Sequence, residues 1–313
     1  MFESFLVALR VVIPMALLMC VGALIRKGNI IDRPTMRAVD KMTFRVFMPT
    51  LLFKNIYETN LSENFNGKEV LFAVVGLALV FLLALLLPPR LVKEPGKSAA
   101  IGQAIIRSNY ILFGIAVAES IYGKGNAGAV ALLGAIAVPA TNALAVVILE
   151  VGRAGKAKPG QIFLSILKNP MVIATLLALA LFALKLRIPE LIYSVVEDIA
   201  GVTTTISFLS LGVSLDLGEV RTNRRPLALG VVLRMVLVPL IFLPLAVALG
   251  FRGQTLCALM VLFAAPAAVA SYPMAVAMGA DGQLAGQLVC TTTVVSIFTM
   301  FCFTFLFQSL GML

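Results

Sequence analysis

Ten apolar segments, each long enough to cross a lipid bilayer, occupy almost all of this 313-residue chain. A transmembrane α-helix needs about 20 mainly apolar residues, and only short loops separate the segments, which are 4–25, 36–57, 69–89, 98–122, 127–150, 170–187, 190–213, 226–249, 253–278 and 283–309. Only 13% of the residues are charged, against about a quarter in soluble proteins. The sequence therefore predicts an all-α polytopic membrane protein with ten transmembrane helices and no sizeable soluble domain.

Basic residues are divided unequally between the two sets of loops. The loops after the first, third, fifth and seventh segments carry 14 Lys and Arg residues, and the loops on the other side carry five. Because cytoplasmic loops are enriched in Lys and Arg, we expect a multi-pass protein of the cytoplasmic (inner) cell membrane with both termini outside. Glu3 precedes the first segment and Arg26 follows it, which favours a retained helix over a signal peptide.

Several function classes are excluded by the composition. The net charge of +10 is explained by these loops and their contact with anionic membrane lipids, so nucleic acid is not an expected partner. The chain has no histidine, no Walker A motif and no Gly-x-Gly-Asp run, so it lacks the residues of His-dependent, ATP-driven and aspartyl protease chemistry. The four cysteines lie inside apolar segments without metal-ligand spacing. We expect no enzyme activity, no metal and no cofactor.

The chain divides near its middle into two halves of five segments. The Pro-Met pair at Pro14 recurs at Pro170, and an interrupted segment is the fourth of each half. Because five is odd, the second half enters the membrane from the opposite side, which makes an inverted repeat. The expected parts are a first five-helix repeat (1–151), a cytoplasmic basic linker with an interfacial helix over 161–168 (152–169), and a second, inverted repeat (170–313).

The two interrupted segments carry residues that a lipid-facing helix avoids. They are Arg107-Ser108-Asn109-Tyr110 and Gly114 in the first, and Pro266 and Ser271-Tyr272-Pro273 in the second. Hydrocarbon tolerates a broken helix only where protein or a water-filled cavity satisfies the freed backbone groups. Both breaks fall near the middle of a ~30 Å core, and a half-helix that begins there presents a positive dipole end. Two such ends predict an anion site at the membrane midplane, whereas simple kinks at Pro266 and Gly114 are the alternative.

The breaks supply most of the candidate substrate-binding residues. The full set is Arg107, Ser108, Asn109, Tyr110, Gly114, Pro266, Ser271 and Tyr272, together with Asn142 in the fifth segment. Asn109 is favoured because an unpaired amide in hydrocarbon is costly. Arg107 is either a countercharge for the substrate, the partner of an acid, or a side chain that extends toward the cytoplasm.

Charged residues elsewhere in the apolar segments have open interpretations. Glu197 and Asp198 in the seventh segment, with Asp40 in the second, are candidates to bind a coupling proton or sodium ion, and solvated acids are the alternative. Arg234, Glu119 and Glu150 are expected in internal ion pairs whose partners the sequence does not define.

Several short motifs, in the same order, resemble the auxin efflux carrier family, to which the plant PIN proteins belong. They are Gln103-Ala104-Ile105-Ile106-Arg107-Ser108-Asn109-Tyr110 before Gly114-Ile115, Lys168-Asn169-Pro170, Leu209-Ser210-Leu211-Gly212-Val213-Ser214-Leu215, Ala264-Ala265-Pro266, Ser271-Tyr272 and Gly279-Ala280-Asp281. The resemblance covers essentially the full length and implies a bacterial member with helices 4 and 9 crossing at their breaks. It also implies a scaffold of helices 1, 2, 6 and 7, a mobile transport domain, and a site at the crossing that includes Asn109 and Asn142.

One departure from the family pattern concerns the first break. The family often has Gly-Ile-Pro where this chain has Gly114-Ile115-Ala116, so this break is expected to rest on glycine and polar residues. The leading hypothesis is a secondary transporter of a small organic anion, a carboxylate or an auxin-like molecule, that works by elevator-like alternating access. The alternative is a membrane sensor or channel on the same fold. A homodimer, the coupling ion and the direction of transport are left open.

Overall fold

The computed structural model describes residues 2–58, 67–154, 159–184, 186–215 and 218–313, and within these ranges the chain is helical with no β-sheet. The first half contains α1 (Phe2–Lys27), α2 (Arg33–Met42), the π-helix η1 (Thr43–Phe47), α3 (Met48–Tyr57), α4 (Gly67–Leu86), α5 (Pro88–Leu91), α6 (Pro95–Ile106), α7 (Tyr110–Tyr122) and α8 (Gly128–Ala154). After α9 (Pro159–Leu167), the second half contains α10 (Pro170–Ala183), α11 (Glu190–Ser214), the 3₁₀ turn η2 (Gly218–Val220), α12 (Arg224–Val232), the π-helix η3 (Leu233–Leu237), α13 (Val238–Ala248), α14 (Gly253–Ala264), α15 (Ser271–Ala277) and α16 (Gly282–Ser309).

The predicted all-helical, polytopic character is supported by the lengths of these helices. Among the described residues, five helical stretches are long and apolar enough to cross a membrane, namely Gly67–Leu91, Gly128–Arg153, Glu190–Ser214, Arg224–Ala248 and Gly282–Ser309. Shorter apolar helices are Tyr110–Tyr122, Pro170–Ala183 and Gly253–Ala264. Ten crossings and the inverted repeat stay predictions. Part of the expected basic linker, 155–158, lies outside the described residues.

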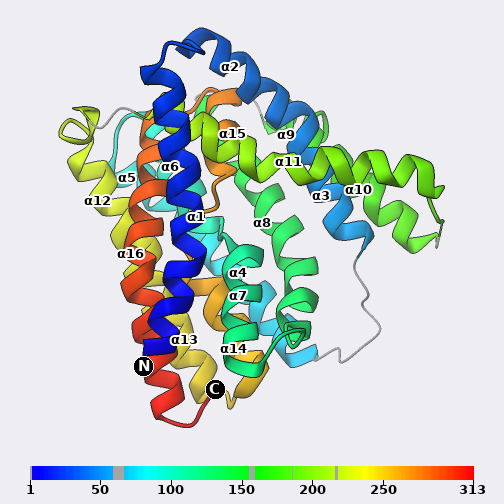
Figure 1. The fold of residues 1–313 in the computed structure, drawn as a ribbon, viewed down its shortest axis with the longest axis vertical. Helices are drawn as coiled ribbons and strands as arrows, with labels where there is room; N and C mark the ends of the chain where they lie inside the picture. Colours follow the sequence, from blue (N-terminus) through cyan, green and yellow to red (C-terminus); the bar gives the residue numbers. More distant parts are fainter. Residues whose placement is uncertain (1, 59–66, 155–158, 185, 216–217) are drawn as a thin grey trace.

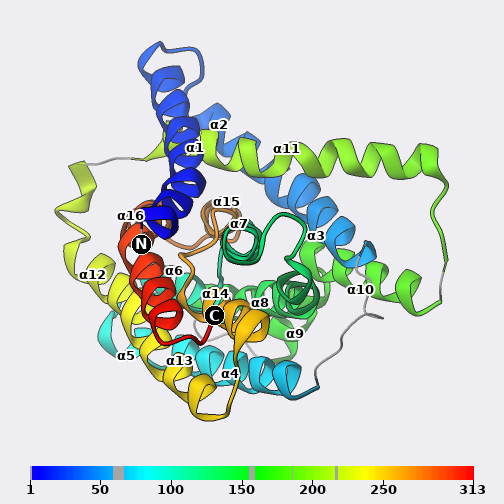
Figure 2. The same ribbon diagram turned by 60° about the horizontal axis from the view of Figure 1, so that its bottom comes forward.

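The helices form two groups (Figures 1 and 2). We call α1, α2, η1, α3, α10 and α11 the outer group, because they lie along one side of the molecule and α11 contacts α1, α2 and α3. The inner group contains α4 to α8 and α12 to α16, in which α6 contacts α4, α8, α12 and α16. The outer group corresponds to the helices that the family resemblance assigns to a scaffold.

The outer group depends on a close approach of α1 and α11. A Cβ atom added to Gly212 would lie 2.8 Å from the carbonyl carbon of Met19, and one added to Gly22 would lie 3.0 Å from the Cα of Gly212. Helices in membranes often meet at small residues, because these let the backbones approach closely. Any larger side chain at either glycine would therefore push the two helices apart.

Local sequence signals set several helix starts. The side chains of Asp32, Asn169 and Asp281 accept hydrogen bonds from the backbone N–H groups of Thr35, Met171 and Leu284 at 2.9, 3.0 and 2.8 Å. These are N-caps, which satisfy one of the free N–H groups at a helix start. The bond from Thr35 also holds the pKa of Asp32, which lies in the loop before α2, below its usual value.

The two interrupted helices run through the centre of the molecule. Every residue of α6 from Ser98 to Ile106 is buried, and so is every residue of α14 from Leu256 to Ala264. A helix that is apolar and buried all round has other helices on every side. Neighbouring protein, and not lipid, therefore surrounds the two positions at which the helices are broken.

Candidate functional site

Both predicted interruptions are present in the structure. Residues 107–109 separate α6 from α7, and residues 265–270 separate α14 from α15. The first helix of each pair ends completely before the second begins, so the alternative of a kink in a continuous helix is wrong. Gly114 lies inside α7, so the expectation that a glycine forms part of the first break is also wrong.

The two breaks cross and pair with each other through the backbone. The N–H of Asn109 donates to the carbonyl of Pro266 at 2.8 Å, and the N–H of Ala268 donates to the carbonyl of Arg107 at 3.2 Å. Ser108 and Ala267 thereby form an isolated antiparallel bridge. Buried backbone groups need partners, and at this crossing each broken helix supplies partners for the other.

A buried arginine binds the C-terminal ends of α6 and α14, the helices that precede the two breaks. The guanidinium of Arg234, on η3, donates to the carbonyl of Ala265 from Nε (2.9 Å) and Nη2 (2.7 Å). It also donates to the carbonyls of Ile105 (2.9 Å) and Leu262 (3.1 Å). The last carbonyls of a helix have no partner inside that helix, and the C-terminal dipole end favours a cation. Arg234 therefore joins the C-terminal ends of α6 and α14.

The expected ion pair of Arg234 is not formed among the described residues. Glu150 instead pairs with Arg153 at 2.8 Å, and the carboxylate of Glu119 accepts the N–H of Gly125. The sequence shows that Arg234 stands in an apolar segment. It does not identify the acceptors of Arg234, because these are backbone carbonyls, which every residue has.

A cavity of about 240 Å³ adjoins the crossing and lies between the two helix groups. Five of the nine predicted substrate-binding residues line it: Arg107, Ser108, Asn109, Tyr110 and Asn142. The outer group contributes Met48, Leu51, Leu52 and Asn55 from α3, Met171 from α10 and Thr204 from α11. Asn55 and Thr204 were not predicted, because one sequence does not tell which helix faces meet across the two groups.

Polar side chains that line this cavity can form more hydrogen bonds than they make within the protein. Arg107 is 5% exposed, and the hydrogen bond of its side chain goes to the sulfur of Met274 at 3.4 Å. The Oδ1 of Asn142 is buried without a hydrogen-bond partner. Within the described part of the chain, no carboxylate pairs with Arg107 and no protein group bonds the side-chain amide of Asn109. A buried guanidinium and two amides therefore meet in one cavity without a protein anion.

The sequence comparisons agree with this arrangement. The sequence profile of the family described as "Membrane transport protein" matches residues 7–304, which include both breaks, the crossing and Arg234. The chain belongs to the auxin efflux carrier family of membrane transport proteins. The comparison with curated proteins finds no match. The predicted resemblance to this PIN-like family over nearly the whole chain is confirmed, and the chain is a multi-pass membrane transporter.

The remaining predicted binding residues of this transporter lie outside the cavity at the crossing. Pro266 contributes its carbonyl to the backbone pairing, and Gly114 packs against α8 and α14 at Val130 and Val261. The hydroxyl of Ser271 is buried without a partner, and Tyr272 donates from its hydroxyl to Asp40 at 3.2 Å. A Tyr272-lined cavity of about 380 Å³ is separate from the one at the crossing.

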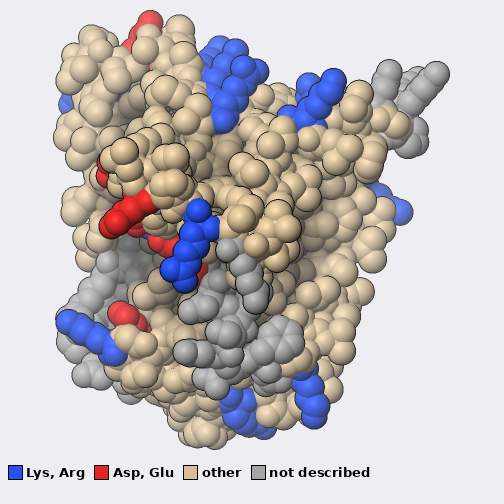
Figure 3. Space-filling model, turned by 90° about the vertical axis from the view of Figure 1, so that its right-hand side faces the viewer, with Lys and Arg blue, Asp and Glu red and all other residues tan. Residues whose placement is uncertain are grey.

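The two acids predicted to bind a coupling ion lie on the exposed surface of α11. Lys54 forms ion pairs with Glu58 (3.3 Å) and Glu197 (3.4 Å). Figure 3, which shows the right-hand side of the molecule in Figure 1, has acidic and basic side chains gathered near its middle. Asp198 is exposed as well, and neither Glu197 nor Asp198 lines the cavity at the crossing. Their coupling role stays a prediction.

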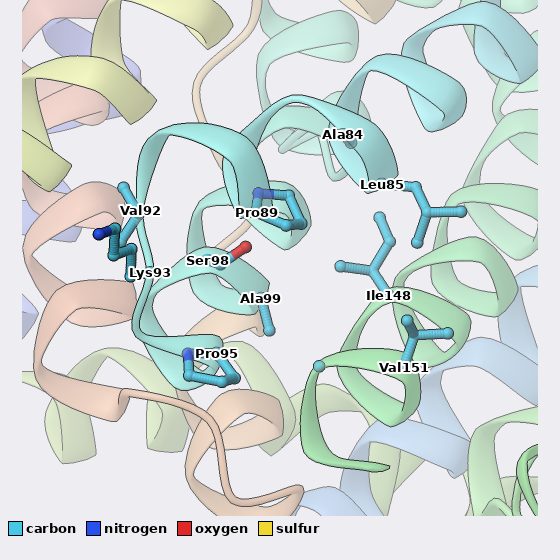
Figure 4. Close-up of a pocket in the computed structure, with 11 residues that line it drawn as sticks. Ala84, Leu85, Pro89, Val92, Lys93, Pro95, Ser98, Ala99, Ile148 and Val151 are labelled. Atoms are coloured by element: carbon cyan, nitrogen blue, oxygen red, sulfur yellow. The ribbon is translucent and has the colours of Figure 1, made fainter. Parts of the chain in front are cut away.

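A third cavity, of about 190 Å³, lies where α4, α5, α6 and α8 meet (Figure 4). Figure 4 shows Leu85, Pro89, Ala99, Ile148 and Val151 around it. The side chains that line it are mainly apolar, with Lys93 and Ser98 as the polar ones. It belongs to the inner group alone, so the cavity at the crossing is the better candidate site.

Proposed function

We propose that this chain is a secondary transporter that binds a small organic anion, a carboxylate or an auxin-like molecule, in the cavity at the crossing. The observation that carries the proposal is the buried guanidinium of Arg107 beside the amides of Asn109 and Asn142, with no protein carboxylate paired to it in the described chain. A buried charge is costly unless it is paired. A bound carboxylate would supply that pair.

The local backbone supports an anion in the same place. α7 begins directly after Asn109, and the first N–H groups of a helix have no partner inside it. The N-terminal dipole end also favours negative charge. α15 has only seven residues, so we place the dipole contribution on α7 alone. This revises the expectation of two equivalent half-helix ends.

The size of the cavity favours a small substrate. Its volume of about 240 Å³ lies below the ~300–1,000 Å³ of typical pockets for drug-sized ligands. Apolar side chains such as Leu51, Leu52 and Met171 form much of its wall on the outer group. These walls would contact the carbon skeleton of the substrate while Arg107 holds its carboxylate.

The position of the cavity suggests how the substrate would cross the membrane. Residues of both helix groups line it, so a displacement of the inner group along the outer group would carry Arg107 and Asn109 while leaving Asn55 behind. Movement of this kind is an elevator-like form of alternating access. We propose it with both termini outside, as the distribution of basic residues predicts.

The test is flux in proteoliposomes that contain the purified protein. Malonate, malate and indole-3-acetate, each radiolabelled, are the probes, and the transporter is expected to give saturable uptake and counterflow for at least one of them. Binding without flux would indicate a sensor, and flux that does not saturate would indicate a channel. Either outcome would overturn the proposed transport function.

A further inference from the structure

We propose that Asp40 is a proton-binding site that controls the contact between the outer group and α15, the helix that follows the second break. The inference rests on the proposed function in one respect, since it gives the two helix groups freedom to move relative to each other. The geometry that carries it is a carboxylate enclosed by hydroxyl groups at the boundary between the groups.

Asp40 is completely buried, with an exposed fraction of 0%. One carboxylate oxygen accepts a hydrogen bond from the hydroxyl of Ser210 on α11, and the other accepts one from the hydroxyl of Tyr272 on α15 at 3.2 Å. Both donors are neutral. The carboxylate therefore has hydrogen-bond partners but no balancing charge from them.

The charged groups around Asp40 do not balance it either. On its own helix and η1, the side chains of Arg37, Lys41 and Arg45 are exposed, and Arg33 stands at the first residue of α2, two turns away. The nearest charged residue of α11 to Ser210 is Asp198, about 18 Å away along the helix axis. α15 has no Asp, Glu, Lys or Arg. No ion pair of Asp40 exists among the described residues.

A proton is the ligand that fits this site. A carboxylate removed from water without a cationic partner carries a large free-energy cost, and one bound proton removes the charge. Among the described residues, no group of three or more Asp, Glu, Cys or His side chains is placed to hold a metal ion. Tyr272 also lines the cavity of about 380 Å³, together with Ser214 and the charged residues Arg37 and Asp281, which gives the proton a route from water.

The site spans the boundary between the two helix groups. Asp40 and Ser210 belong to the outer group and Tyr272 to the inner group, and these helices meet at one end of the molecule (Figure 1). A second bond across the same boundary runs from the side-chain amide of Gln283 to the carbonyl of Ser214 at 2.9 Å. At the end of α15, the side-chain amide of Asn169, the N-cap of α10, also donates to the sulfur of Met278 at 3.7 Å. The bond between Tyr272 and Asp40 is therefore one of the polar contacts that hold α15 against the outer group.

Proton binding would weaken this contact. The ionised carboxylate accepts from both hydroxyls, and hydrogen bonds to an ionised acceptor are roughly twice as strong as neutral ones. After one proton binds, the carboxyl group has its own O–H donor and the bond from Tyr272 loses its charge. Proton binding is therefore expected to loosen α15 from α2 and α11 and to favour displacement of the inner group.

The test measures the distance between the groups without any substrate. Spin labels are attached to cysteines at Thr35→Cys in the outer group and Lys93→Cys in the inner group, both at exposed positions, after the native cysteines have been replaced. Double electron–electron resonance in nanodiscs then records the distance distribution between about pH 5 and about pH 8. The wild-type background is expected to shift between two distributions with pH.

Asp40→Asn is expected to show one distribution at every pH, equal to the acidic distribution of the parent. Tyr272→Phe is a second variant that keeps the carboxyl group, and it is expected to favour the same distribution with a smaller pH response. Glu190→Gln, which changes an exposed acid at the start of α11, is the matched control and keeps the parent response. A pH response that persists in Asp40→Asn, or a parent that does not respond to pH, overturns the proposal.

The outcomes separate this inference from the proposed function. If the distances follow pH as expected while malonate, malate and indole-3-acetate show no flux, the proton site stands and the transport assignment fails. If flux is present but the distances of Asp40→Asn still follow pH, the proton site is wrong and the transport assignment stands.

Discussion

Arg234→Met is the substitution whose effect on stability can be worked out most directly from the structure. It removes the guanidinium that donates to the carbonyls of Ile105, Leu262 and Ala265 but keeps a long, apolar side chain. Each buried acceptor left without a partner costs about 1–3 kcal/mol, which gives a range of about 3–9 kcal/mol for three carbonyls. Removing a buried charge recovers part of this cost, so we expect a loss of about 3–5 kcal/mol in the free energy of unfolding.

The chain offers a matched control for this substitution. Arg252 also donates to backbone carbonyls, those of Val247 in the last turn of α13 and of Phe251 in the loop that follows, but its side chain is exposed. Water can replace those bonds, so Arg252→Met should cost less than about 1 kcal/mol. Equilibrium unfolding in mixed micelles of dodecyl maltoside and SDS measures both. Equal, small losses for the two variants would refute the role assigned to Arg234.

Two further predictions concern packing and topology. Gly212→Leu should separate α1 from α11, because a Cβ at this position already overlaps Met19, and the melting temperature should fall by several degrees. Gly201→Leu, at a glycine with open space around it, should leave the melting temperature nearly unchanged, and similar melting temperatures for the two variants would contradict the close approach. Cysteines at Lys93 and Lys124 should be labelled by an impermeant maleimide from opposite faces of the membrane, and labelling of both from one face would contradict the predicted orientation.

The interruption of two helices could be predicted from the sequence because it has a local cause. Arg107 to Asn109 and Pro266 stand in the middle of apolar segments, where neither lipid nor a continuous helix favours them. The family resemblance added that the breaks cross. Gly114 was placed in the break wrongly, because a glycine inside an apolar segment is equally suited to close packing, which is its role beside Val130.

Contacts between distant helices could not be predicted in the same way. Asp40 and Tyr272 are 232 residues apart, and their hydrogen bond depends on how α2 and α15 pack. The acceptors of Arg234 are carbonyls that become free only because both α6 and α14 end beside it. Asn55 and Thr204 join the site from the outer group, so finding them requires the arrangement of the two groups.

The most direct test of the central claim is the affinity of the crossing for an organic anion after Arg107→Gln. Isothermal titration of the purified protein with malonate, malate and indole-3-acetate identifies the probe that binds, and the variant is then titrated with the same probe. A hydrogen bond to a charged group contributes about 1.5–3 kcal/mol, so the Kd should rise about 10- to 100-fold while the melting temperature without ligand stays close to that of the parent. Asn126→Ala, at an exposed loop amide, should leave the Kd unchanged. An unchanged Kd in Arg107→Gln would contradict an anion site at the crossing of the two broken helices.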